Sequence, residues 1–222
     1  MPEATVFVTG TGTEVGKTWL TAVIATLLRE DGWAVAARKP VMSFDVSDGT
    51  TDAEVLALAT GETELEVCPS HRRYELPMAP PMAAEVLGRP AFTIEDLLAE
   101  LTLPENGLAL VEGVGGPRSP LAADGDSVTF IEGLQPEHVV LVAPSGLGAI
   151  NDVMTSCDAL GRAPIVFLNR FESDNELQLR NLDWLRERAG LSAYTDPEEV
   201  VERLASAPPN NLGTRSRSVE VQ

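Results

Sequence analysis

Short apolar runs alternate along this chain with longer stretches in which apolar residues recur every three or four positions. The apolar runs have the length of strands and cover residues 5–9, 34–39, 108–112, 139–143 and 165–169. The stretches with helical spacing cover residues 19–28, 52–60, 81–87, 94–101, 152–160 and 175–189. Continuously apolar strands that alternate with helices predict a mostly parallel sheet with helices on both faces. We therefore expect an α/β fold.

The length of 222 residues suits one domain with a substantial core. We expect this domain to cover residues 1–206. Residues 207–222 are rich in Pro, Asn, Ser and Arg and carry no periodicity, which predicts a flexible C-terminal tail.

The net charge is −18, from 34 acidic and 16 basic residues. Such a surface repels phosphates, so we expect neither a nucleic acid nor an anionic membrane as a partner. The apolar runs are too short to cross a membrane, and the chain does not begin with the basic segment of a targeting signal. Cys68 and Cys157 form neither a zinc pattern nor a disulfide framework, which favours a cytoplasmic location.

The basic residues comprise only two lysines, Lys17 and Lys39, and 14 arginines. Excess carboxylate with almost no lysine suggests adaptation to a high-salt cytoplasm, where self-repulsion is screened. A GC-rich genome that prefers arginine codons is the alternative, although it would not by itself account for the acidity. A guanidinium differs from an ammonium in reach and geometry, so we interpret both retained lysines as functional.

The first lysine belongs to the glycine-rich segment Gly10-Thr-Gly-Thr-Glu-Val-Gly-Lys17-Thr18, which follows a predicted strand and precedes a predicted helix. Five residues separate Gly10 from Gly16, one more than in the usual phosphate loop. The loop N–H groups can still bind an anion, with Lys17 at the outer phosphates and Thr18 at Mg²⁺. The alternative is a Gly-Thr-rich turn with a chance lysine. The order of strand, loop and helix favours a P-loop NTPase fold that binds a nucleotide.

The segment Thr9 to Thr18, followed by Lys39-Pro40-Val41, closely resembles the dethiobiotin synthetase family. Later segments agree with that family in order and spacing, from about Val6 to Leu185. They are Tyr74-x-x-Pro77-x-Ala79-Pro80-x-x-Ala83-Ala84, Val111-Glu112-Gly113-x-Gly115-Gly116, Leu147-Gly148-x-Ile150-Asn151 and Val166-x-Leu168-Asn169. The family also closes over the adenine with Leu-Gly-x-Ile-Pro, and residues 190–197 depart from that pattern.

The resemblance implies roles for particular residues. Lys17 and Lys39 would be catalytic, and Thr18, Asp52 and Glu112 would hold Mg²⁺. Thr13, Lys39 and Ser43 would face 7,8-diaminononanoate, and Leu147, Gly148 and Asn151 of a neighbouring subunit would hold its tail carboxylate, so the resemblance implies a homodimer with a shared site. The residues implied for ATP are Glu14, Val15, Gly16, Lys17, Thr18, Trp19, Asp52, Glu112, Gly113, Val114, Gly115 and Asn169.

Three of these residues have simpler interpretations. Asp52 could cap the helix that begins there, Lys39 could be a strand-end lysine in solvent, and Asn169 could be a turn residue. Glu112 ends an apolar strand, where an unpaired carboxylate would be costly, so we expect a cation beside it.

The implied reaction converts a vicinal diamine, CO₂ and ATP into dethiobiotin, ADP and phosphate, in biotin synthesis. Three alternatives are considered. A cobyrinate-type amide ligase would need a glutaminase segment that this length does not allow. A partitioning or metallochaperone ATPase switch would carry an extra lysine early in the loop, where this chain has Thr11 and Gly12. A noncatalytic nucleotide-binding regulator is the third.

Overall fold

A computed structural model describes residues 4–206, and within this range one six-stranded sheet forms the centre of the molecule. All neighbouring strand pairs in the sheet are parallel. In spatial order the strands are β10 (Ala193–Tyr194), β9 (Ile165–Asn169), β8 (His138–Pro144), β1 (Ala4–Gly10), β5 (Leu108–Glu112) and β2 (Val35–Arg38). The expected parallel α/β sheet is confirmed. The predicted tail, residues 207–222, lies outside the described residues.

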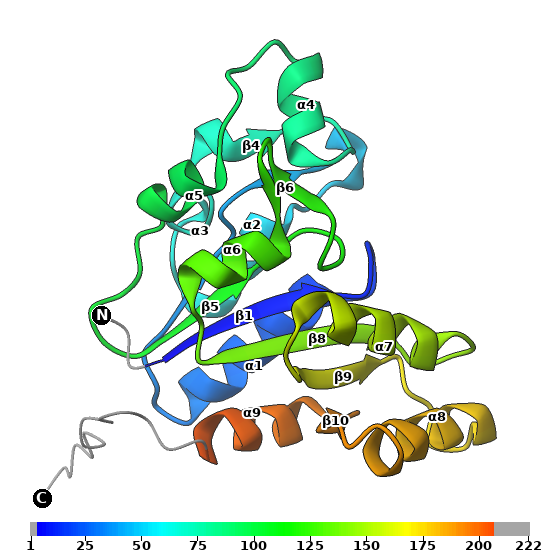
Figure 1. The fold of residues 1–222 in the computed structure, drawn as a ribbon. Helices are drawn as coiled ribbons and strands as arrows, with labels where there is room; N and C mark the ends of the chain where they lie inside the picture. The colour runs from blue at the N-terminus through cyan, green and yellow to red at the C-terminus, as the bar shows by residue number, and fades with distance from the viewer. Residues whose placement is uncertain (1–3, 207–222) are drawn as a thin grey trace, which may run out of the picture.

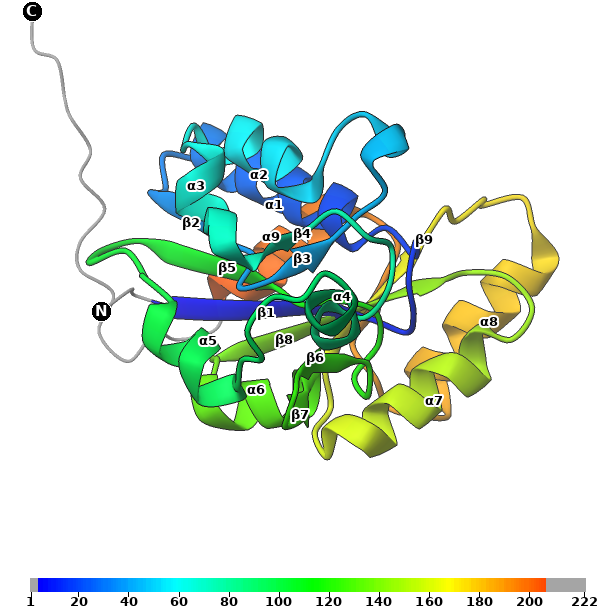
Figure 2. The same ribbon diagram turned by 90° about the horizontal axis from the view of Figure 1, so that it is seen from above.

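Helices cover both faces of the sheet, as Figures 1 and 2 show. Alternate residues of β1 point to opposite faces, so Val6 and Val8 join one apolar cluster and Phe7 joins another. The first cluster is closed by α1 (Lys17–Glu30) and α9 (Pro197–Ser206). The opposite face is covered by α5 (Ile94–Glu100), α6 (Ser127–Leu134), α7 (Ala149–Leu160) and α8 (Glu176–Glu187).

Smaller elements surround one end of the central sheet and its helices. The helix α2 (Asp52–Thr60) packs beside α1, and α3 (Glu64–Val67) follows it. Two short strand pairs lie outside the main sheet: β3 (Met42–Ser43) with β4 (Arg73–Tyr74), and β6 (Pro120–Ala122) with β7 (Gly125–Asp126). The remaining elements are α4 (Pro80–Val86) and the 3₁₀ turns η1 (Val46–Asp48) and η2 (Ser70–Arg72).

Three helices of the described residues were not predicted: the four-residue α3, and the longer α6 and α9. The α6 segment contains β-branched and aromatic residues and Gly133, all weak helix formers, and it is stabilised by the Asp126 side chain, which accepts a hydrogen bond from Thr129 N. The α9 segment begins with Pro197 followed by two acidic residues, which is a helix start signal. Residues 4–206 contain no helix that combines the length and apolar character needed to cross a bilayer.

Candidate active site

The carboxyl ends of the central strands open into a cleft of about 860 Å³. Ligands of open parallel sheets generally bind at this edge. Most of the residues proposed from the sequence line the cleft together. They are Thr13, Glu14, Gly16, Lys17, Thr18, Trp19, Lys39, Ser43, Asp52, Val114 and Gly115.

The glycine-rich loop connects β1 to α1 in a strained conformation. Gly16 has φ +101°, and a side chain there would also meet Asn169 Nδ2 at 2.0 Å, so only glycine fits. Glu14 adopts φ +60°, which is uncommon for a residue with a side chain. The Lys17 ammonium is buried and donates a hydrogen bond to Gly12 O at 3.0 Å. The loop is thus folded around its own lysine beside the start of α1.

The second lysine lies at the end of β2, at the centre of a buried cluster. Lys39 is 2% exposed, and its Nζ donates to Glu112 Oε1 at 2.6 Å and to Asp52 Oδ2. The Thr18 hydroxyl donates to the same Glu112 oxygen at 2.7 Å. We call Thr18, Lys39, Asp52 and Glu112 the cleft cluster. The Lys39 ammonium is therefore a cation beside Glu112, while Mg²⁺ at this carboxylate stays a prediction. The interpretation of Lys39 as a solvent-exposed lysine is wrong.

The cluster shifts the protonation equilibria of its members. Burial alone would lower the pKa of Lys39, but the charges of Glu112 and Asp52 outweigh burial and raise that pKa above its ordinary value. Burial likewise opposes ionisation of Asp52, yet the Lys39 ammonium holds its pKa below the ordinary value. Burial, followed by the charge of Lys39, lowers the pKa of Lys17. Both partners of the Lys39–Asp52 ion pair therefore remain charged near neutral pH.

The donor set of the cleft cluster fits Mg²⁺. Glu112 is fully buried, and its Oε2 has no hydrogen-bond partner among the described residues. A buried carboxylate oxygen with a free lone pair, beside a hydroxyl and a second carboxylate, offers the hard oxygen ligands that this ion requires. Asp52 is free for such a role because Thr51 caps α2 through a capping box with Glu54. The interpretation of Asp52 as the helix cap is therefore wrong.

The proposed diamine residues separate into two groups. Thr13 and Ser43 line the cleft, and the Ser43 hydroxyl donates its proton to Met78 O, which leaves its lone pairs available to a ligand. Leu147, Gly148 and Asn151 lie at the start of α7, outside the cleft lining of this chain. Leu147 is 91% exposed. Within this chain these three residues do not join the site.

Besides Glu112, three of the proposed nucleotide residues lie behind the cleft lining. Val15 and Asn169 contact each other, because Asn169 Nδ2 donates to Val15 O at 2.9 Å. Gly113 passes directly over Phe7. Other residues that line the cleft were not predicted from the sequence, including Phe44, Asp45, Ser119 and Arg170. Arg170 gave no signal beyond its place after Asn169, since one arginine among 14 is unremarkable by type.

Solved structures support the fold. The chain resembles the signal recognition particle receptor FtsY from Elizabethkingia anophelis, with a TM-score of 0.52 and 12% sequence identity. The match covers 85% of this chain and 56% of the receptor chain, so the present chain spans little more than half of that protein.

Sequence comparisons identify the relatives. A family described as an AAA domain matches residues 4–215. A protein of Methylobacterium nodulans named ATP-dependent dethiobiotin synthetase BioD is 38% identical, over 71% of this chain and 75% of its own length. Proteins of the same name from Haloferax mediterranei and Rhodococcus jostii are 35% and 36% identical, over 86% and 90% of this chain and 82% and 88% of their own lengths. The chain belongs to the ATP-dependent dethiobiotin synthetase family.

Proposed function

We propose that this chain is an ATP-dependent dethiobiotin synthetase, which closes a cyclic urea on 7,8-diaminononanoate. The observation that carries the proposal is the cleft cluster, in which Lys39 lies between Asp52 and Glu112 beside the phosphate loop. Family membership supports the same activity.

The reaction has three steps. One amine of the substrate attacks CO₂ and loses a proton, which gives a carbamate. A carbamate oxygen attacks the γ-phosphorus of ATP, and the bond from that phosphorus to the bridging oxygen breaks and releases ADP. The second amine then attacks the carbonyl carbon of the mixed anhydride, loses a proton and expels phosphate, which closes the ring.

The two lysines supply fixed positive charge where negative charge gathers. Lys17 would neutralise oxygens of the outer phosphates, and Lys39 would stabilise the carbamate and the transferring phosphoryl group. Both ammonium groups are held in place by contacts of the cleft, Lys17 by Gly12 O and Lys39 by the two carboxylates. Positions fixed in advance reduce the reorganisation needed as the charge moves.

We also assign Mg²⁺ to this site, with Thr18, Asp52 and Glu112 as its protein ligands. When bound, the ion would supply further neutralisation of phosphate charge. The unpartnered Oε2 of Glu112 supports this assignment. Thr13 and Ser43 would orient the diamine, while Glu14, Gly16, Trp19, Val114 and Gly115 would surround the nucleotide.

A homodimer is part of the proposal. The cleft of one subunit is not lined by its own Leu147, Gly148 and Asn151. These residues lie at the start of α7, a 12-residue helix whose first N–H groups can bind a carboxylate. A second copy would bring these residues to the tail of the substrate.

Phosphate release tests the activity. Mg·ATP hydrolysis should require both the diamino acid and CO₂, with dethiobiotin identified by mass spectrometry. Robust phosphate release without the diamine, stimulated by a protein partner, would support the ATPase switch instead. ATP binding without turnover under any of these conditions would support the noncatalytic regulator.

Salt dependence tests the dimer. The charge of −18 per subunit implies strong mutual repulsion, whose range grows from about 3 Å at 1 M salt to about 30 Å at 0.01 M. We expect a dimer in molar KCl that dissociates in dilute buffer, with diamine affinity falling more than ATP affinity. Sedimentation and calorimetric titration at several KCl concentrations measure both. A fully active monomer at high salt would refute the shared site.

A further inference from the structure

Arg170 lines the cleft, but the roles proposed for the two lysines and the metal ligands give it no function. It follows β9 directly, lines the cleft and adopts φ +56°, in the left-handed region. An arginine in that region is strained, and such strain persists only where surrounding contacts fix it.

Buried polar side chains fix the backbone of Arg170 on both sides. Its N–H donates to Asn169 Oδ1 at 2.9 Å, and its carbonyl accepts a hydrogen bond from the Ser145 hydroxyl at 3.1 Å. Asn181 Nδ2 in turn donates to Ser145 O at 2.9 Å. Since Asn169 also donates to Val15 O, the same residues join the strained position to the phosphate loop.

The side chain of Arg170 differs from most arginines of the described residues, which form ion pairs or, as Arg29, Arg89 and Arg162 do, donate hydrogen bonds to carbonyl oxygens. Within residues 4–206, its guanidinium makes no hydrogen bond or ion pair, although Arg38, Arg72, Arg73, Arg118, Arg180 and Arg186 all form ion pairs with carboxylates. The fold therefore holds an unpaired planar cation at the lining of the cleft.

The sheet order indicates which part of the ligand lies beside Arg170. Lys39 follows β2 and Glu112 ends β5, on one side of β1, whereas Arg170 follows β9, on the other side. Under the proposed function the terminal phosphate lies with Lys39 and Glu112, so the nucleoside extends toward β9. Trp19 lies on that side too, 49% exposed, with its ring centroid 6.1 Å from that of Phe167 in β9.

We propose that Arg170 is a nucleotide-contacting residue whose guanidinium lies against the base, at the end of the cleft that Trp19 borders. The planar guanidinium and the indole are both suited to stacking on a flat heterocycle. This inference rests on the proposed function for the direction of the nucleotide, and it names residues for the base end of that site.

The test is calorimetric titration of the full chain with ATP, ADP and inorganic tripolyphosphate, without diamine. The variant Arg170→Asn removes the guanidinium, and asparagine tolerates the left-handed backbone. We expect about tenfold weaker binding of both ATP and ADP and unchanged binding of tripolyphosphate. Arg188→Asn removes an exposed arginine that also has no ion pair among the described residues, and it should leave all three affinities unchanged.

Arg170→Lys separates stacking from charge. It keeps the cation and loses the plane, so it should bind ATP about as weakly as Arg170→Asn. Wild-type affinity in Arg170→Lys, or an equal loss for tripolyphosphate, would overturn the base contact in favour of a phosphate contact. Unchanged ATP binding in a folded Arg170→Asn would also overturn the proposal. Because no diamine is present, failure to form dethiobiotin would leave the result of this test intact.

Discussion

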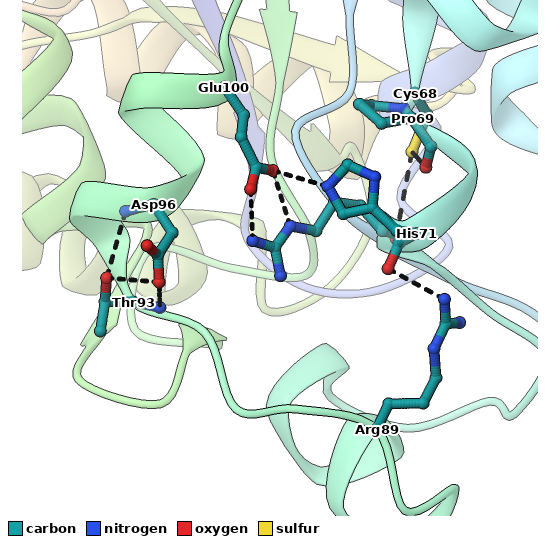
Figure 3. A network of polar contacts seen from close by, with 8 residues as sticks. Cys68, Pro69, His71, Arg89, Thr93, Asp96 and Glu100 are labelled. Carbon is teal, nitrogen blue, oxygen red and sulfur yellow. Dashed lines mark hydrogen bonds and ion pairs between the residues drawn. The ribbon is translucent and has the colours of Figure 1, made fainter.

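Two charged clusters of this molecule differ in how completely their hydrogen bonds are satisfied. In the cleft cluster, Glu112 is fully buried and its Oε2 is left without a partner among the described residues. In the second cluster, drawn in Figure 3, Glu100 uses both oxygens. Arg72 donates to them at 2.7 and 2.8 Å, and His71 Nε2 lies 3.0 Å from one of them.

The second cluster continues into a stack of flat groups, which we call the rim stack. The Arg72 guanidinium lies 4.4 Å from the Phe92 ring centroid, and Phe92 stacks on Tyr74 at 5.8 Å. On the other side, Arg89 lies 4.7 Å from the Tyr74 ring centroid. Tyr74 ends β4, which pairs with β3 and thereby holds Ser43 at the cleft. The cluster around Glu100, in which both carboxylate oxygens have partners, supports the fold around the cleft. The cleft cluster keeps one carboxylate oxygen, Glu112 Oε2, available to a ligand.

The largest expected effect is on the cleft cluster. Lys39→Arg keeps the charge, but a guanidinium cannot occupy the ammonium position between Asp52 and Glu112, so turnover should fall roughly a hundredfold or more. The turnover of Lys17→Arg should fall by a similar factor. Steady-state phosphate release measures both, and thermal unfolding checks that the fold is retained. Near wild-type turnover in either variant would remove that lysine from the mechanism.

A smaller effect is expected at the rim stack. Arg72→Ala removes a buried side chain, its two hydrogen bonds to Glu100 and its contact with Phe92, and should destabilise the fold by about 2–3 kcal/mol. Chemical denaturation measures the loss. The control is Arg180→Ala, which removes an exposed pair with Glu176 and should cost less than about 0.5 kcal/mol.

Activity of the folded Arg72→Ala protein completes this test. We expect kcat within about twofold of the wild type at a temperature where the variant stays folded, because Arg72 supports the frame and touches no cleft residue of the proposed mechanism. A large fall in kcat without loss of stability would erase the distinction between the two clusters.

The smallest effect concerns pH. The hydrogen bond from Arg72 holds the pKa of Glu100 below its ordinary value of 4.5. A carboxyl whose pKa is lowered by folding adds stability that is present above pH 4.5 and is lost as the pH falls through the folded-state pKa. Glu100→Gln should therefore lose less stability than the wild type between about pH 5 and about pH 3. Denaturation at each pH tests this, with Glu95→Gln on the same helix as the control; parallel pH curves would contradict it.

The sequence predicted the elements with strong periodicity and the residues of recognisable loops. The strands β5 and β9 and the helix α2 begin and end where the apolar pattern predicts. Lys39, Asp52 and Glu112 were expected near one another because of the family resemblance, and the fold brings them together although they are far apart in sequence.

Other features depend on contacts that no local pattern reports. The cap of α2 is Thr51, one residue before Asp52, for which the cap was the alternative interpretation, and both residue types are favoured as caps. The short pairs β3–β4 and β6–β7 are too brief to carry a period. The strained backbone of Arg170 arises from Ser145 and Asn169, and only the folded chain brings Ser145 close enough to fix it.

The sheet order also determines when this protein can fold during synthesis. The first strand, β1, lies between β5 and β8, so one of its edges stays unpaired until the ribosome has made β5, which ends at Glu112, and the other until it has made β8, which ends at Pro144. The hydrogen bond from Asn169 to Val15 spans 154 positions, so this contact of the phosphate loop can form only after Asn169 has been made. Contacts of such long range fold slowly and leave strand edges open to aggregation. The growing chain therefore depends on protection of its first strand until most of the domain has emerged.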